Sequence, residues 1–261
     1  MSSWMTGFIG LIRYRELVRN LVAKDLKVKY RGSVLGLLWS LLNPLAMIVV
    51  YSLAFQYILR IPLKNYPLFL ITGIIPWNFF SGAVIASSEA IIGNANLLKK
   101  VKFPLEILPF ATILFNFIQL LFALLVFFPA VFWFKTEVTP LILLYLPVLG
   151  LQFLFTLGVA FFLSSITTRY RDVRHLTEVA LMVLFWLTPI IYSISMVPGK
   201  LQLLIKVNPL TAFITVYQDI IYWGRLPRPE TFISMVLWTC LSLGVGYSLF
   251  RRRQRVFVEE L

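Results

Sequence analysis

Side chains that could do acid–base or metal chemistry are few and scattered along this chain. The three aspartates, Asp25, Asp172 and Asp219, are too far apart in sequence to indicate the paired carboxylates of an acid–base catalyst. The single histidine, His175, has no cysteine or histidine beside it, and we place it in a solvated loop. The single cysteine, Cys240, lies within an apolar run. We therefore expect no catalytic residue, no metal site and no disulfide.

Sequence motifs for nucleotide binding and hydrolysis are also absent. The chain contains no GxxxxGK(S/T) phosphate-binding loop, no HExxH zinc motif and no GxSxG nucleophile motif. Glu89 is the one acid clearly inside a long apolar run, and we interpret it as a carboxylate at the membrane interface. If this protein moves something uphill, the energy must come from another subunit.

The composition indicates an integral membrane protein. Of 261 residues, 59% are hydrophobic and 13% are charged, whereas soluble domains are about half apolar and a quarter charged. The mean hydropathy is +0.85. A net charge of +13 raises the possibility of nucleic-acid binding, but the cations stand at the ends of apolar runs. That placement is typical of lipid headgroup contacts and of membrane topology, so we expect no nucleic-acid partner.

Six apolar runs are long enough to cross a bilayer, at about 20 residues per crossing. We place them at residues 35–59, 68–92, 107–134, 141–166, 179–195 and 231–250. Lysine and arginine are distributed unevenly: 17 of the 24 lie on the side that holds both ends of the chain, which predicts that both termini are cytoplasmic. The chain is thus predicted to be all-α, with one transmembrane domain over residues 1–261.

The N-terminal segment before the first run is basic and amphipathic. Between Leu11 and Tyr30 the apolar side chains fall on one helical face and the cations mostly on the other. Such a helix lies in the headgroup plane. Residues 1–34 are therefore predicted to form a cytoplasmic interfacial segment, residues 35–250 the six spans, and residues 251–261 a cytoplasmic tail. Ser33 is expected to cap the helix that follows. The N-terminus lacks the features of a secretory signal, so we expect no processing.

The connection between the fifth and sixth runs is unusually apolar. Asn208 and Pro209 indicate a helix start, with the asparagine as cap and the proline in the first turn. These helices are interpreted either as lying on the outer leaflet or as a re-entrant pair that dips into the bilayer. Polar residues at membrane depth are tolerated where they face protein or water. We favour the re-entrant interpretation.

Four local patterns follow one another along the chain. They are YRGSVLGLLW from residue 30 with NPL at 43–45, GNANLLKKVKFP at 93–104, RYRDV at 169–173, and TPIIY at 188–192 followed by NPL at 208–210. In this order they resemble the ABC-2 type permeases that export polysaccharides, over nearly the whole chain. The resemblance points to the membrane subunit of exporters of O-antigen or related lipid-linked polysaccharides. Capsule and teichoic acid exporters share the pattern.

This resemblance implies a homodimer that recruits two separate ATPase subunits, which would carry the ATP and magnesium; no cofactor is expected on this chain. The segment 93–104 matches the coupling region of the family. Its expected ATPase contacts are Asn96, Leu97, Lys99, Lys100 and Phe103. Cytoplasmic topology also accounts for the lysines. It does not account for Phe103 and Pro104 directly behind them.

The implied cargo is a polysaccharide on a polyprenyl pyrophosphate lipid, moved across the bacterial inner membrane. Local charge suggests an entrance for the pyrophosphate, formed by Arg13, Arg15, Lys27, Lys29 and Arg31. Aromatic rings suit a sliding sugar chain because sugars present apolar C–H faces. The candidate lining residues are Trp39, Tyr51, Trp77, Phe79, Phe80 and Tyr192, although an interfacial aromatic belt explains any single one.

Two other functions compete with polysaccharide export. One is an ABC-2 exporter of a drug or small lipid, which would have the same architecture and a narrower or more hydrophobic path. The other is a membrane enzyme that processes polyprenyl lipids. Such enzymes normally need acidic metal ligands or a catalytic base, and the scarcity of carboxylates argues against this alternative.

Overall fold

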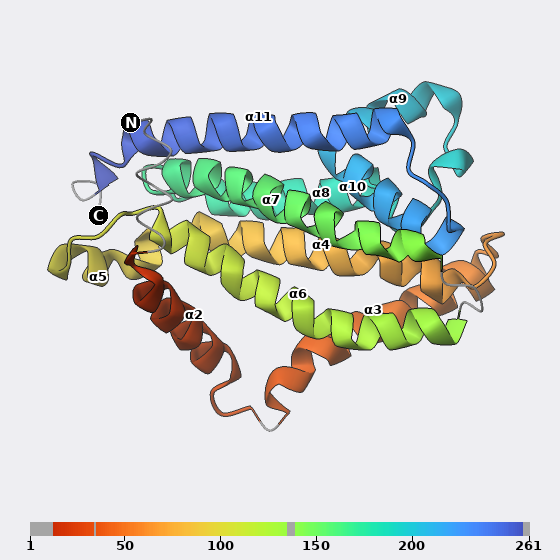
Figure 1. The fold of residues 1–261 in the computed structure, drawn as a ribbon, viewed down its shortest axis with the longest axis horizontal. Helices are drawn as coiled ribbons and strands as arrows, with labels where there is room; N and C mark the ends of the chain where they lie inside the picture. Colours follow the sequence, from red (N-terminus) through yellow and green to blue (C-terminus); the bar gives the residue numbers. More distant parts are fainter. Residues whose placement is uncertain (1–12, 34, 135–138, 258–261) are drawn as a thin grey trace.

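A computed structural model describes residues 13–33, 35–134 and 139–257 of the chain. Within these ranges the chain forms helices and turns but no strand, which confirms the all-α prediction (Figure 1). Parts of two predicted segments fall outside the described residues. They are residues 1–12 and 34 of the interfacial segment, including Leu11, where the N-terminal helix was expected to begin, and residues 258–261 of the tail.

Four long apolar helices form the body of the described part of the protein. They are α4 (Tyr66–Ser88), α6 (Ile107–Phe134), α7 (Tyr145–Thr167, preceded by the 3₁₀ turn Pro140–Leu144) and α11 (Pro229–Arg253). Each is long and apolar enough to cross a membrane. Helix α4 lies at the centre and packs against α6 and α7, while α7 packs along α11 (Figure 1).

The first predicted span is helical over nearly its whole length, and the fifth is shorter than expected. In the first, a 3₁₀ turn (Gly36–Leu38), α3 (Trp39–Tyr51) and a π-helical segment (Ser52–Ile58) follow one another without a break. In place of the fifth, α8 (Val173–Leu187) has 15 residues and starts before the predicted boundary. It ends directly before Thr188 and Pro189. A proline cannot donate the next helical hydrogen bond, and it disfavours helical geometry in the residue before it.

The amphipathic N-terminal segment forms α2 (Arg15–Tyr30). Its buried side chains, Val18, Leu21 and Val22, belong to the face that packs on α6. A turn then leads to α3, so α2 and α3 form the two arms of a V (Figure 1). In this turn the Ser33 hydroxyl accepts a hydrogen bond from the Gly36 backbone N–H at 3.0 Å, as the capping prediction required.

After α8 the chain forms a helical hairpin that folds back into the protein. Its arms are α9 (Gly199–Val207) and α10 (Pro209–Gln218), and α10 continues as a π-helical turn (Asp219–Trp223). The predicted cap is confirmed, because Asn208 Oδ1 accepts a hydrogen bond from the Leu210 N–H at 3.0 Å. Asn208 Nδ2 also donates to Thr188 Oγ1 at 2.9 Å. The tip of the hairpin therefore lies against the end of α8.

The side chains of α10 are almost entirely enclosed by protein. Phe213 packs on Phe155 of α7 with ring centroids 5.1 Å apart, and the Tyr217 hydroxyl donates to Gln152 Oε1 at 2.8 Å. Farther along, the Tyr222 hydroxyl donates to the Lys64 carbonyl. Hence α10 runs from the end of α8 toward the 59–65 connection, packed against α4, α7 and α11.

Candidate transport path and coupling surface

A polar cavity of about 380 Å³ opens between the end of α2 and helices α3, α4 and α6. Its polar lining consists of one lysine and a group of amide and hydroxyl side chains: Lys29, Asn43, Asn78, Ser81, Asn116 and Gln119. Asn43 and Asn78 are exposed, whereas Asn116 and Gln119 are half-buried. This cavity therefore offers donors and acceptors for a polar ligand between apolar helices.

Lys29 is held at this cavity by specific contacts. Its Nζ donates to Gln119 Oε1 and lies 5.7 Å from the centroid of the Phe115 ring. The Tyr30 hydroxyl reaches the same Gln119 oxygen at 3.4 Å. Although much of the Lys29 side chain remains exposed, desolvation by the surrounding protein lowers its pKa. A positioned and partly desolvated ammonium beside amides suits an anionic group such as a phosphate.

The structure does not gather all five predicted entrance residues. Arg13 and Arg15 lie at the start of α2, while Lys27, Lys29 and Arg31 lie at its end. At about 1.5 Å per residue, the two groups are separated by roughly 20 Å. Lys27 and Arg31 line a shallow groove on the surface of α2. Of the five residues, only Lys29 lines the polar cavity.

A second cavity, of about 320 Å³, adjoins the first, and its lining includes four aromatic side chains together with aliphatic and methionine side chains. The Trp77 and Phe185 ring centroids are 5.5 Å apart, and those of Tyr51 and Phe185 are 6.1 Å apart. Trp186 completes the aromatic group. The two cavities share three lining residues, Met47, Asn78 and Ser81. The amide-lined cavity and the aromatic cavity therefore lie side by side at α4.

Only some of the predicted lining residues reach these cavities. Tyr51 and Trp77 line the aromatic cavity and Phe79 the polar one. Tyr192 borders the aromatic group, since its hydroxyl donates to the Trp186 carbonyl at 3.0 Å. Phe80 instead stacks on Phe155 in the protein core, with centroids 5.6 Å apart.

The remaining predicted lining residue, Trp39, is exposed at the start of α3 and lines neither cavity. Conversely, the sequence analysis missed Phe185 and the amides Asn78, Asn116 and Gln119. Polar side chains inside long apolar runs were the available signal for the amides, because they are costly there and usually functional.

The predicted coupling residues lie on and after α5 (Ala95–Lys100), which projects from one end of the molecule (Figure 1). Asn96, Lys99 and Lys100 are exposed, whereas Leu97 and Phe103 are half-buried and pack against the core. A hydrogen bond of 3.0 Å from Lys24 Nζ to Asn94 Oδ1 joins α2 to this segment. The apolar members therefore fix the segment, and the polar members point outward.

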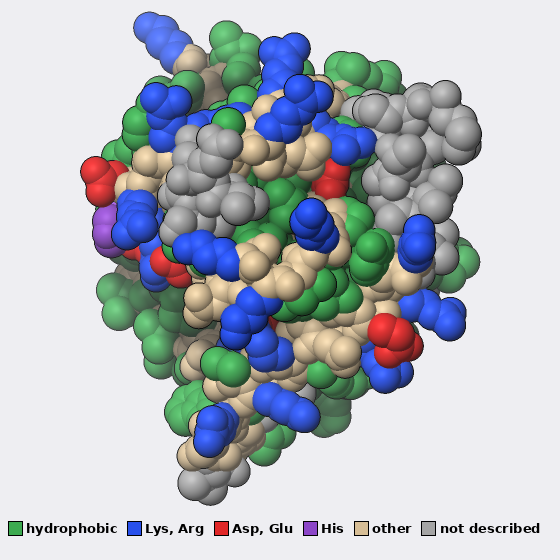
Figure 2. Space-filling model, turned by 90° about the vertical axis from the view of Figure 1, so that its left-hand side faces the viewer, with side chains coloured by type: hydrophobic (Ala, Val, Ile, Leu, Met, Phe, Trp, Pro, Cys, Tyr) green, Lys and Arg blue, Asp and Glu red, His purple; other side chains and the backbone are tan. Residues whose placement is uncertain are grey.

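Lysine and arginine side chains are spread over the described surface of this end of the protein (Figure 2). Two ion pairs join different parts of the chain here, and a third lies within α8. Arg174 of α8 contacts Glu89 just beyond α4 and bonds Glu178 at 3.2 Å, and Arg251 of α11 lies 3.4 Å from the buried Glu106. Glu89 thus stands at a helix end, as expected of a carboxylate at an interface.

The single histidine and the single cysteine lie on different helices. His175 is exposed, as predicted, but it lies in the first turns of α8 rather than in a loop. Cys240 is exposed on α11. Among the described residues, no group of three or more histidine, cysteine or acidic side chains is placed to hold a metal ion.

Comparison with known proteins places this helical architecture in a family. Residues 16–222 match the profile of the family described as ABC-2 type transporter. The chain belongs to the ABC-2 type transporter family. It is 32% identical to the O-antigen export system permease protein RfbA of Myxococcus xanthus, with 96% of this chain and 97% of that protein aligned.

Two further relatives span nearly the whole chain. An RfbA of Klebsiella pneumoniae, also described as an O-antigen export system permease protein, is 33% identical over 94% of this chain and 95% of its own length. The polysialic acid transport protein KpsM of Escherichia coli is 21% identical over 92% of this chain and 95% of its own length. Membership of a transporter family makes the chain a multi-pass membrane transport protein and not an enzyme.

Proposed function

We propose that this chain is the permease of an ABC exporter that moves a lipid-linked polysaccharide of O-antigen type across the bacterial inner membrane. The observation that carries the proposal is the pair of adjoining cavities. An amide-lined cavity with a fixed lysine is suited to a phosphate and its first sugar. The aromatic cavity beside it is suited to the apolar faces of a sugar chain. The similarity to O-antigen export permeases extends over the same helices.

The proposed topology has six crossings, with both termini in the cytoplasm and residues 1–261 forming one permease domain. The end that carries α5 and the clustered lysines and arginines faces the cytoplasm. Helix α2 starts at the cytoplasmic side and is inclined to the headgroup plane, because its last turn reaches Gln119, about 18 Å along α6. The α9–α10 hairpin is re-entrant from the outer side. The enclosure of α10 and the contact of Asn208 with Thr188 support re-entry, because a hairpin lying on the surface would leave α10 exposed.

The proposed assembly is a homodimer with two ATPase subunits, which bind the ATP and magnesium. Apolar side chains are exposed on α3, on the π-helical segment that follows it and on α8, among them Val49, Leu53, Val179 and Met182. A second copy packed there would cover these side chains and enclose the path. Asn96, Leu97, Lys99, Lys100 and Phe103 are the proposed contacts to the ATPase.

Within this assembly we assign the pyrophosphate to the end of α2. Lys29 contacts it at the polar cavity, and Lys27 and Arg31 attract it from the adjoining groove. Arg13 and Arg15 extend the positive surface toward the cytoplasm. The glycan then follows Tyr51, Trp77 and Tyr192, with Trp39 and Phe79 at the margins of the path.

Charge reversal at Lys27, Lys29 and Arg31 tests this path. We expect the triple glutamate variant to insert normally and to lose export, because its entrance repels the pyrophosphate. Surface glycan is the readout, and Lys200→Glu, an exposed position on α9, is the control. Normal export by the triple variant would overturn the assignment of the entrance.

A drug or small-lipid exporter is the principal alternative. The amide side chains of the first cavity favour a hydroxyl-rich cargo over an apolar one. The O-antigen permeases are about 32–33% identical to this chain and the polysialic acid transport protein is 21% identical, which favours an O-antigen-type glycan over a capsule glycan.

A further inference from the structure

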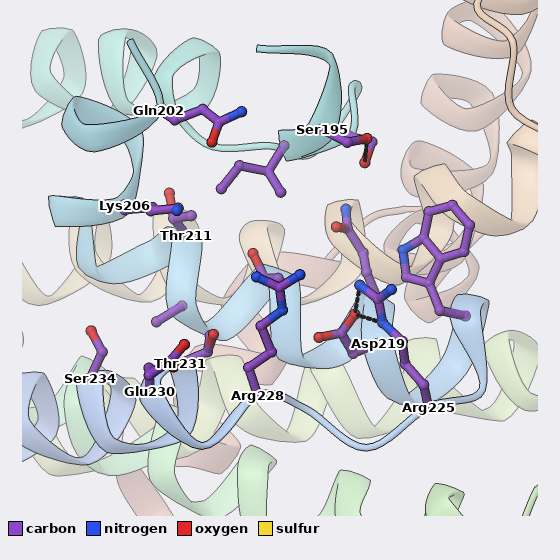
Figure 3. A pocket seen from close by; sticks show the side chains of 16 residues that line it. Ser195, Gln202, Lys206, Thr211, Asp219, Arg225, Arg228, Glu230, Thr231 and Ser234 are labelled. Carbon is purple, nitrogen blue, oxygen red and sulfur yellow. Dashed lines mark hydrogen bonds and ion pairs between the residues drawn. The ribbon is translucent and has the colours of Figure 1, made fainter. Parts of the chain in front are cut away.

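A third cavity, of about 470 Å³, lies away from the proposed path, between the α9–α10 hairpin and the start of α11. Its walls come from three stretches of chain. Ser195 and Gln202 stand on one side, Thr231 and Ser234 of α11 stand opposite, and Thr211 of α10 lies beside Lys206 (Figure 3). It lies at the part of the protein that the proposed topology places on the outer side of the membrane.

Two buried hydroxyls at this cavity have no hydrogen-bond partner among the described residues. They are Thr211 Oγ1 and Thr215 Oγ1, one helical turn apart on α10. Thr211 is only 3% exposed. Most buried hydroxyls in this chain bond a backbone carbonyl, as Thr239 Oγ1 does with Met235 at 2.8 Å. An unpaired hydroxyl in a protein interior is costly, and a polar ligand in the cavity would satisfy it once the threonine side chain rotates toward the ligand.

The charges at this cavity favour a neutral polar ligand over an anion. Arg225 is already paired: its Nε and Nη2 lie 2.8 and 2.7 Å from Oδ1 of the buried Asp219 (Figure 3). The remaining cations, Arg228 and Lys206, share the lining with the carboxylate of Glu230. With these three cations set against Asp219 and Glu230, the charges of the lining nearly balance, which favours a polar ligand of little charge.

The other lining groups suit a saccharide. Hydroxyl and amide side chains supply both donors and acceptors, as sugar hydroxyls require. Trp223, at the rim, is 43% exposed and offers a ring to the C–H face of a sugar. The volume lies within the usual range for small-ligand sites, about 300–1,000 Å³.

We propose that this cavity is a saccharide-binding site at the outer mouth of the permease, where a short segment of the emerging glycan binds. The assignment of the glycan rests on the proposed export function. The site itself is separate from the cytoplasmic entrance and from the aromatic cavity, with which it shares no lining residue.

Photo-crosslinking in exporting cells tests the proposal. Ser195→Cys, in a Cys240→Ala background, carries a benzophenone at the cavity. The control is Leu204→Cys, which is exposed on the other side of α9, since it lies two residues from both Gln202 and Lys206. We expect irradiation to attach the cell's own glycan to the Ser195 position and not to the Leu204 position.

A second variant separates binding from folding. Thr211→Val removes the unpaired hydroxyl without changing the side-chain volume, so the thermal midpoint should stay the same or rise. We expect it to lower the crosslink yield at Ser195 about fivefold, as for the loss of one neutral hydrogen bond. Thr239→Val, which removes a hydroxyl outside the cavity, should leave the yield unchanged.

The outcomes distinguish this site from the transport function. Absence of surface glycan in cells with the wild-type chain would contradict the export function itself. If glycan reaches the surface, three results would overturn the saccharide site: equal labelling at positions 195 and 204, an unchanged yield in Thr211→Val, or adducts with phospholipid in place of glycan.

Discussion

At the scale of single residues, Asn208 shows how one side chain determines the course of the chain. Its oxygen caps α10 and its amide nitrogen bonds Thr188, so a single buried side chain joins the end of α8 to the tip of the hairpin. The sequence predicted the cap, because asparagine before proline is a frequent helix start. It did not predict the bond to Thr188, since the two residues are brought together only by tertiary folding.

Replacing Asn208 by alanine should destabilise the protein by about 1–2 kcal/mol, because both the cap and the cross-segment bond are lost. Thermal unfolding of the purified protein in detergent measures this. Asn96→Ala is the matched control: Asn96 is exposed on α5, and its loss should not change the unfolding midpoint. Equal midpoints for all three proteins would show that the hairpin tip is not held by Asn208.

At the scale of helices, α7 and α11 cross at unusually close range because glycine stands at the contact. A Cβ atom built at Gly246 would lie 2.0 Å from the Gly158 carbonyl oxygen. Ser242, one turn earlier on α11, donates to the Phe155 carbonyl at 3.2 Å. Small residues four apart are typical of close helix contacts in membranes.

Gly246→Ala should therefore force α7 and α11 apart and destabilise the protein by about 1–3 kcal/mol. Gly244→Ala is the control on the same helix. Its Cβ would meet no atom within 4 Å, so this change should be neutral or stabilise α11 by up to about 1 kcal/mol. Thermal midpoints of the two variants give the comparison. A midpoint in Gly246→Ala as high as in Gly244→Ala would contradict the close contact.

The short helix α5 yields a binding prediction. Lys99→Glu with Lys100→Glu reverses the exposed charges, and we expect this double variant to lose the ATPase on purification under gentle detergent. Phe103→Ala should also weaken retention of the ATPase, because it removes the half-buried ring that fixes the segment. Lys200→Glu, on α9, is the control. Retention of ATPase by the double variant would exclude α5 as the docking site.

Hydropathy alone predicted the central helices with nearly correct bounds, because α4, α6, α7 and α11 are long, apolar and ended by polar turns. It failed at the fifth run. There the apolar pattern continues past Thr188 and Pro189, although the helix ends before them. Hydropathy reports how apolar a segment is and not the direction of the chain. An apolar helix followed by a buried apolar turn is therefore predicted as one continuous span.

At the scale of the whole molecule, the two ends of the described helical bundle carry different features. One end carries α5, the ion pairs between helices and a broad positive surface (Figure 2). The other carries the hairpin and its polar cavity. Between them run the amide and aromatic cavities. Tyr51 and Trp77 were predicted from the sequence as lining residues. Their assembly with Phe185 required the fold, because the three residues come from three different helices.

The most direct test is to locate the lipid-linked glycan in cells with and without this chain, by treating intact spheroplasts with a glycan-specific enzyme or lectin. We expect the glycan to be accessible from outside when the chain and its ATPase are present. Without the chain, it should accumulate where only lysed cells expose it. Equal accessibility from outside in cells that lack the chain would contradict its role as the export permease.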